Sequence, residues 1–202
     1  MDKKQEFIDL YTYHITRPGA AALLAWMENE TEFFTAPASS KHHGAERGGL
    51  VVHSLNVYRR LREIALREIV MDTPADLWPE VEESLAIMGL LHDLCKNDVY
   101  HPEMKRRRDP ATGQWGDVQE YTFRDPFPFG HGEKSVYLIT QHMKLTPDEA
   151  LAIRWHMGAF DDAAKGGGKA LNAAMDMTPW VWRLHQADMC ATHEDEREEP
   201  TG

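Results

Sequence analysis

The stretch AIMGLLHDLCK, at residues 86–96, decides the fold that the sequence predicts. Its apolar residues leave almost no polar face, so a helix that contains them is expected to be buried on nearly all sides. This helix is predicted to begin at Trp78 or Pro79 and to run to Lys96. His92 and Asp93 close the buried segment, where polar side chains require partners.

A second predicted helix runs from Leu50 to about Ile69 and also carries a polar group on its core face. Its apolar side chains recur at helical spacing, and His53 lies on the same stripe. A lone histidine on such a stripe is more often a hydrogen-bonded core residue than a metal ligand. The case for His53 as a metal ligand therefore depends on the other candidate ligands.

Two later helices begin with the same signal, a capping threonine followed by proline, at Thr146 and Thr178. The first carries His156 on its apolar face and the second carries Asp188. A buried carboxylate without a partner costs several kcal/mol, so Asp188 needs a hydrogen bond, an ion pair or a metal ion. His185, three residues earlier, is a candidate hydrogen-bond partner for it.

In chain order the polar groups form the pattern H…HD…H…H…D, which supplies six candidate ligands for one or two divalent metal ions: His53, His92, Asp93, His131, His156 and Asp188. Burying several polar groups together is tolerated when they satisfy one another or share a cation. Imidazole nitrogens with a few carboxylates suit transition metals, here Mn, Fe, Co, Ni or Zn. The pattern therefore predicts a transition-metal site.

The rest of the chain is also mostly helical in pattern. Residues 3–14 and 19–29 are predicted to form two amphipathic helices separated by an Arg-Pro-Gly break. Residues from about 104 to 124 are expected to form a β-hairpin around an Asp-Pro-Ala-Thr-Gly turn. We therefore predict an all-α helical bundle with a small hairpin insertion. It forms a single domain over residues 1–192, and an acidic, disordered tail without a role in the site follows over 193–202.

Composition excludes several classes of protein. A chain of 202 residues with 42% hydrophobic and 27% charged residues suits one globular core. No apolar run approaches the roughly 18–20 residues of a membrane-spanning helix, and the first residues lack a signal peptide pattern. Cys95 and Cys190 cannot form a disulfide framework, so we expect a cytoplasmic protein. A net charge of -11 argues against extended nucleic-acid binding but leaves a small phosphorylated substrate open.

The ordered ligand set and its flanking segments resemble the histidine-aspartate (HD) domain superfamily of metal-dependent phosphohydrolases, which are all-helical. The similar segments are KHHGAERGGLVVHSLNV, GLLHDLCK with its HD-x-x-K pattern, HGEKS, RWHMG and HQADM. The resemblance covers most of the chain, although the hairpin departs from the minimal domain. It implies that His53, His92, Asp93 and Asp188 hold a first metal ion.

In superfamily members with two further histidines, the doublet aspartate bridges to a second metal, so the resemblance implies a binuclear centre completed by His131 and His156. It further implies hydrolysis of a nucleotide or another small phosphoester by a metal-activated hydroxide, with Asp93 and Lys96 as catalytic residues. Two cations acidify the attacking water and draw charge from the phosphoryl oxygens.

Two other functions fit the same residues. The six-ligand pattern also resembles the mixed-valent di-iron oxygenases of the superfamily, because the ligands are shared and the choice of metal depends on their surroundings. A nucleotide-sensing module without catalysis is a further alternative, although such modules usually lack a ligand. Lys96 favours phosphate chemistry, since it places a cation one turn beyond the doublet.

Three residues are predicted to bind the substrate phosphate: Lys96, Arg47 and His43. The alternative for Lys96 is a lysine that complements the dipole at a helix C-terminus. Arg47 lies in a glycine-flanked loop, where a solvated surface arginine is an equally good interpretation. His43 either contacts the phosphate or orders that loop. Lys134 is a weaker candidate, because a lysine facing solvent at a helix start is common.

Overall fold

The structure is a computed structural model, and it describes residues 2–41, 44–109 and 111–197. The α-helices of this described part are α1 (Lys3–His14), α2 (Ala20–Asn29), α3 (Gly49–Glu68), α4 (Trp78–Leu91), α5 (His131–Thr140), α6 (Pro147–Trp155), α7 (Asp162–Lys165), α8 (Ala170–Met177) and α9 (Trp180–Cys190). Shorter helical turns are η1 (Leu94–Lys96), η2 (Gly158–Phe160) and the π-helical η3 (Ala191–Asp195). The two strands are β1 (Tyr100–Arg108) and β2 (Trp115–Phe123). The predicted all-α class with a hairpin insertion is confirmed.

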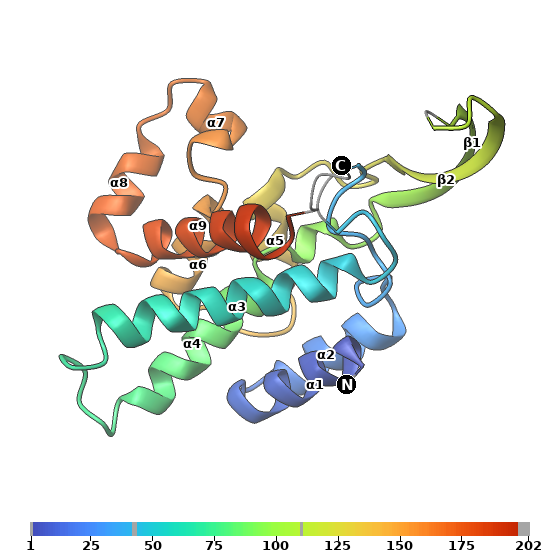
Figure 1. The fold of residues 1–202 in the computed structure, drawn as a ribbon. Coiled ribbons are helices and arrows are strands. Elements are labelled where there is room, and N and C mark those ends of the chain that lie inside the picture. The colour runs from blue at the N-terminus through green and yellow to red at the C-terminus, as the bar shows by residue number, and fades with distance from the viewer. Residues whose placement is uncertain (1, 42–43, 110, 198–202) are drawn as a thin grey trace.

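Helix α3 is the central element, and α4 and α9 both pack against it (Figure 1). The apolar stripe predicted for this helix is its buried face, because Leu50, Val57 and Leu61 are fully buried. Burying one such side chain contributes about 1.5–3 kcal/mol, before the cost of ordering it. His53 lies within this stripe and is also buried, so the core of the bundle and the candidate site share one helix face.

Helices α3 and α4 approach each other closely at Gly89. A β-carbon added there would lie 2.5 Å from Cα of Tyr58 on α3, which is closer than such atoms can pack. The missing side chain therefore permits the crossing. Helix α4 ends at Leu91, two residues beyond Gly89, so the crossing also holds the end of α4 beside α3.

The doublet lies just beyond the end of α4 rather than inside a helix. The α-helix was predicted to run to Lys96, which is wrong: it ends at Leu91, and a turn at His92 and Asp93 leads into η1. Nδ1 of His92 lies 3.0 Å from the backbone oxygen of Gly89. The imidazole therefore hydrogen-bonds to a carbonyl in the last turn of the helix. Because the backbone turns here, both side chains of the doublet can face the same interior.

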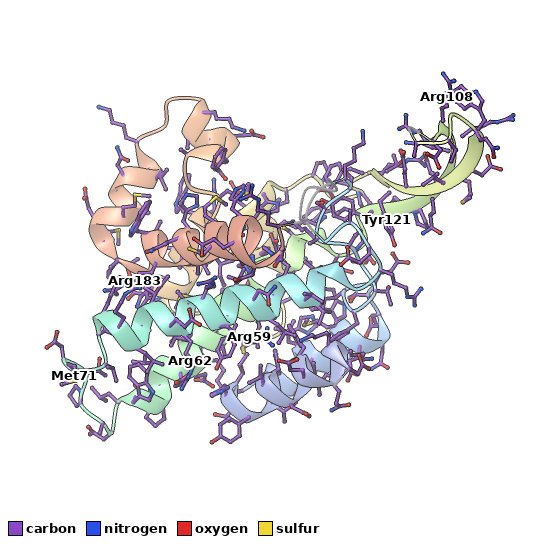
Figure 2. All side chains as sticks on the ribbon, in the orientation of Figure 1. Arg59, Arg62, Met71, Arg108, Tyr121 and Arg183 are labelled. Atoms are coloured by element: carbon purple, nitrogen blue, oxygen red, sulfur yellow. The ribbon has the colours of Figure 1, made fainter. Side chains whose placement is uncertain are left out.

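The β-hairpin projects from the helical body (Figure 1). Its strands are antiparallel and pair from Tyr100 with Phe123 to Arg108 with Trp115, so the hairpin is longer at its start than the predicted 104–124. Figure 2 shows Arg108 at the far end of the arm and Tyr121 nearer the body. The basic run at residues 105–108 therefore lies on the arm and away from the bundle core.

The chain beyond α9 is held against α3. Arg60 of α3 donates to Asp195 over 2.8 Å and pairs with Glu194 at 3.2 Å. The prediction of a disordered tail from residue 193 therefore differs from the structure for residues 193–197, because contacts with α3 order this part; residues 198–202 lie outside the described part. In the described ranges, no helix has the length and apolar character needed to cross a bilayer.

Candidate metal centre

Five segments of the chain bring the six predicted ligands together. The contributing residues are His53 of α3, His92 and Asp93 after α4, His131 at the start of α5, His156 at the end of α6, and Asp188 of α9. All are buried except His131, whose side chain is 33% exposed. The predicted cluster therefore exists as a spatial group, with His131 at its accessible edge.

The two carboxylate oxygens of Asp93 face two different pairs of histidines. Oδ2 lies 3.4 Å from Nε2 of His53 and 3.4 Å from Nε2 of His92. Oδ1 lies 2.9 Å from Nε2 of His131 and 3.5 Å from Nε2 of His156. The carboxylate of Asp93 therefore lies between the two histidine pairs.

Asp188 completes the half of the cluster that contains His53 and His92. Its Oδ1 lies 3.3 Å from Nε2 of His53, and that nitrogen lies 3.3 Å from Nε2 of His92. Among the described residues, three groups could hold an ion, because their ligand atoms lie within 4.8 Å of one another: His53 with His92 and Asp188, His92 with Asp93 and His156, and Asp93 with Cys95 and His131.

The donor set fits a metal ion, and one atom points to it directly. Nε2 of His156 is buried and has no hydrogen-bond partner within the part of the chain that the structure describes. Its Nδ1 lies 2.7 Å from the backbone oxygen of Ile153, which places the ring hydrogen on Nδ1 and leaves Nε2 as a lone pair. A buried nitrogen without a partner is costly, and a cation beside Asp93 would satisfy it.

Charges within the cluster determine its protonation. Burial alone would raise the pKa of Asp93, but the positive charge of Lys96 and the neighbouring His92 hold it well below the usual range. Burial would likewise raise the pKa of Asp188, yet its contact with His53 lowers the net value. Both carboxylates are therefore ionised at neutral pH and available to a cation.

Lys96 contributes a positive charge to the cluster. Its Nζ lies 2.7 Å from Oδ2 of Asp93, and its side chain is 16% exposed. Burial alone would lower the pKa of Lys96, but the charge of Asp93 raises it above the ordinary value. The ammonium group is therefore charged and lies beside the carboxylate that faces both histidine pairs, in a position that suits the predicted phosphate contact.

The other predicted substrate contacts lie elsewhere or outside the described residues. Arg47 is exposed in the loop before α3, and its predicted role stays a prediction. His43 lies outside the described residues. Lys134 was a weaker candidate on the expectation of a solvent-facing side chain; instead it is buried and pairs with Asp125 at 2.5 Å.

Sequence reasoning missed Glu196, which contacts the cluster. Both carboxylate oxygens of Glu196 lie 3.1 Å from Nδ1 of His53, and Oε1 accepts from Asn56 over 3.0 Å. The side chain of Glu196 is 7% exposed. The available signal was its position eight residues after Asp188, about two helical turns, but the surrounding acidic run suggested a solvated tail.

His185 contacts a different partner from the one suggested by its spacing. Its Nδ1 donates to the backbone oxygen of His156 over 2.7 Å, rather than contacting the carboxylate three residues later. Gly158 makes room for this ring, since a β-carbon there would lie 2.8 Å from the imidazole. His185 therefore connects α9 to the end of α6, where His156 lies.

Fold and cluster together define an all-helical protein with a buried histidine and carboxylate centre able to hold divalent metal. The family model described as HD domain matches residues 50–193, which is more than half of the chain. The chain belongs to the HD domain family, as its motifs suggested. Searches of curated proteins and of solved structures each give no significant match. Membership of this family indicates a metal-dependent hydrolase type of function.

Proposed function

We propose that the protein is a metal-dependent phosphohydrolase that hydrolyses a nucleotide or another small phosphoester. The observation that carries this proposal is the position of Lys96, whose Nζ lies 2.7 Å from the carboxylate that faces both histidine pairs. A metal centre alone does not select phosphate. A charged lysine at its centre adds a second type of contact that a phosphoryl oxygen can use.

Within this function the chain's own residues hold and orient the substrate. Divalent ions, when bound to the six ligands, supply an acidified water and positive charge for the phosphoryl oxygens. We propose that Asp93 keeps the two histidine pairs on opposite sides of its carboxylate. Lys96 then binds a non-bridging phosphoryl oxygen and holds the phosphorus atom in line for attack.

The exposure of the cluster supports a small substrate. His131 and Lys96 are its most accessible residues, and the other ligands are at most 8% exposed. A cavity of about 250 Å³ reaches His131 and is also lined by the acidic residues Glu133, Asp161 and Asp162. The net charge of -11 opposes a polyanion.

A substrate screen tests the proposed function. The purified protein is loaded in turn with Mn, Fe, Co, Ni or Zn and given nucleoside mono-, di- and triphosphates, cyclic nucleotides and nitrophenyl phosphoesters. We expect phosphate or nitrophenol release with at least one metal, and its loss in Asp93→Ala. Asp117→Ala, an exposed change on the hairpin, is the matched control. No release from any substrate with any metal would contradict the proposal.

A further inference from the structure

Cys95 lies beside the half of the cluster that contains His131. Its Sγ is 3.2 Å from Nδ1 and 3.7 Å from Nε2 of His131. Asp93, Cys95 and His131 form one of the groups whose ligand atoms lie within 4.8 Å of one another. The residue is only 4% exposed, so the sulfur faces the cluster region rather than solvent.

We propose that Cys95 is a sulfur ligand for the second divalent ion, together with Asp93 and His131. This inference deepens the proposed function, on which it rests, because it adds a ligand to the same centre. It changes the donor set of that ion from nitrogen and oxygen alone to a set that includes a thiolate.

Ligand separations support the assignment. Atoms bonded to one ion at about 2.0–2.3 Å lie roughly 3–4 Å from one another. The sulfur of Cys95 lies 3.2 Å from Nδ1 and 3.7 Å from Nε2 of His131, and both distances lie in this range.

The unpartnered nitrogen of His156 is an independent observation that points to a cation beside the Asp93 carboxylate. Among the described residues, Nε2 of His156 is buried without a hydrogen bond, and it faces Oδ1 of Asp93, the oxygen that His131 also contacts. A cation beside this oxygen would satisfy the nitrogen. The sulfur of Cys95 groups with Asp93 and His131, while His156 groups with His92 and Asp93, so Asp93 is the residue that the two groups share.

The backbone of Cys95 is fixed relative to His131. The amide of Cys95 donates to Oγ of Ser135 over 3.0 Å, and Ser135 is fully buried. Ser135 lies four residues after His131 on α5, so the two side chains share one helix face. This contact holds η1 against α5 and sets the distance between the sulfur and the imidazole.

A thiolate ligand has a chemical consequence for the choice of ion. Sulfur favours borderline or soft ions such as Zn, Fe or Co over Mg, Ca or Mn, which prefer oxygen. We therefore infer that the second position takes one of the former ions. The first position, with His53, His92 and Asp188, contains no sulfur among its described ligands.

Cobalt spectroscopy tests this inference, because a cobalt–thiolate bond gives a near-ultraviolet charge-transfer band that nitrogen and oxygen ligands lack. Co²⁺ is titrated into the metal-free full chain as wild type, Cys95→Ser and Cys190→Ser. The chain has 2 cysteines, so Cys190→Ser retains only Cys95. We expect the band in wild type and Cys190→Ser, and its absence from Cys95→Ser with at least about tenfold weaker binding of one cobalt ion.

Several outcomes would overturn the inference. These are cobalt binding in wild type without the band, a band that persists in Cys95→Ser, a band lost in Cys190→Ser, and no cobalt binding at all. If Cys95→Ser does not fold, the band in Cys190→Ser still decides. Phosphate release without the band would contradict the role of Cys95 as a metal ligand and leave the phosphohydrolase proposal intact. The band without phosphate release would support Cys95 as a metal ligand and contradict the phosphohydrolase proposal.

Discussion

Both carboxylate oxygens of Glu196 lie 3.1 Å from Nδ1 of His53, a residue 143 positions earlier in the chain. A carboxylate on the outer nitrogen of a ligating histidine fixes the ring and raises the basicity of the other nitrogen. Nε2 of His53 is thereby turned toward Asp93 and Asp188. The segment after α9 thus orients a predicted metal ligand on α3.

Replacing Glu196 is expected to weaken metal binding. Glu196→Ala should lower the affinity for Zn²⁺ or Co²⁺ by about 10–100-fold, and Glu196→Gln should lower it less because an amide oxygen still accepts a hydrogen bond. Competition with a chelator measures both affinities. Glu194→Ala is the matched control, since its side chain is 61% exposed and pairs with Arg60. Equal affinities for Glu196→Ala and wild type would show that Glu196 does not position His53.

Replacing Lys96 separates substrate binding from metal binding. Lys96→Met should reduce kcat/KM for phosphate release by about 10²–10³, the usual loss for one group that stabilises a developing anion. Metal content should remain, because the lysine repels a cation and its removal leaves Asp93 free to bind one. Elemental analysis and steady-state kinetics check the two quantities. Lys105→Met, on the hairpin, is the control; an unchanged kcat/KM would rule out the phosphate contact.

The fold was predictable where local pattern and burial coincide. The stripe around His53 and the Thr-Pro pairs before α6 and α9 are encoded by nearby residues, so these helices were anticipated. Thr146 caps α6 as predicted, whereas the N-cap of α9 is Pro179 and not the predicted Thr178. The end of α4 was not, because it depends on a turn in which His92 contacts a backbone oxygen while facing the cluster. A helix former such as Leu94 gives no local reason to stop.

The site was predictable only where residue type is itself a signal. Histidines on apolar stripes stand out, which is why His53, His92 and His156 could be anticipated, whereas the place of His131 rested on the resemblance to the HD superfamily. Glu196 could not be distinguished from Glu194 by type or by neighbours, since one contacts His53 and the other lies at the surface. Cys95 likewise looks like an ordinary apolar helix residue in the sequence. Only the turn at Asp93 brings its sulfur beside His131.

The crossing of α3 and α4 should be sensitive to a single methyl group. Gly89→Ala would place a β-carbon 2.5 Å from Cα of Tyr58, so the helices must separate. Overpacking of this kind costs about 1–3 kcal/mol and exceeds the gain in helix propensity, which is about 1 kcal/mol. Urea unfolding measures the loss. Gly116→Ala, with open space around it, is the control, and equal stability of the two variants would contradict a tight crossing.

Separation of these helices should also weaken metal binding, because His53 belongs to α3 and His92 follows the end of α4. The metal affinity of Gly89→Ala is therefore expected to fall along with its stability. A chelator competition at a temperature where the variant is fully folded measures this effect. Unchanged affinity in the folded variant would mean that the ligands adjust independently of the crossing.

The stability of the bundle should depend on pH through Glu83 of α4. Its Oε1 accepts from the backbone amides of Thr16 and Arg17 over 2.7 and 3.0 Å, and its Oε2 pairs with the Arg17 side chain at 3.1 Å. Burial raises the pKa of Glu83, but these backbone hydrogen bonds and Arg17 lower the net value below the ordinary 4.5. The carboxylate therefore stabilises the fold above pH 4.5, and this contribution is lost as the pH falls through the lowered pKa.

Glu83→Gln removes the charge and tests this dependence. At neutral pH the variant should unfold with about 1–3 kcal/mol less free energy than wild type, because hydrogen bonds to a charged group are lost. The difference should shrink as both proteins are taken below pH 4.5, since the wild-type carboxylate then becomes protonated. Urea unfolding at a series of pH values measures it, with the exposed Glu80→Gln as control. A difference that stays constant with pH would assign the effect to side-chain shape rather than charge, because only a titrating group makes the stability gap depend on proton concentration.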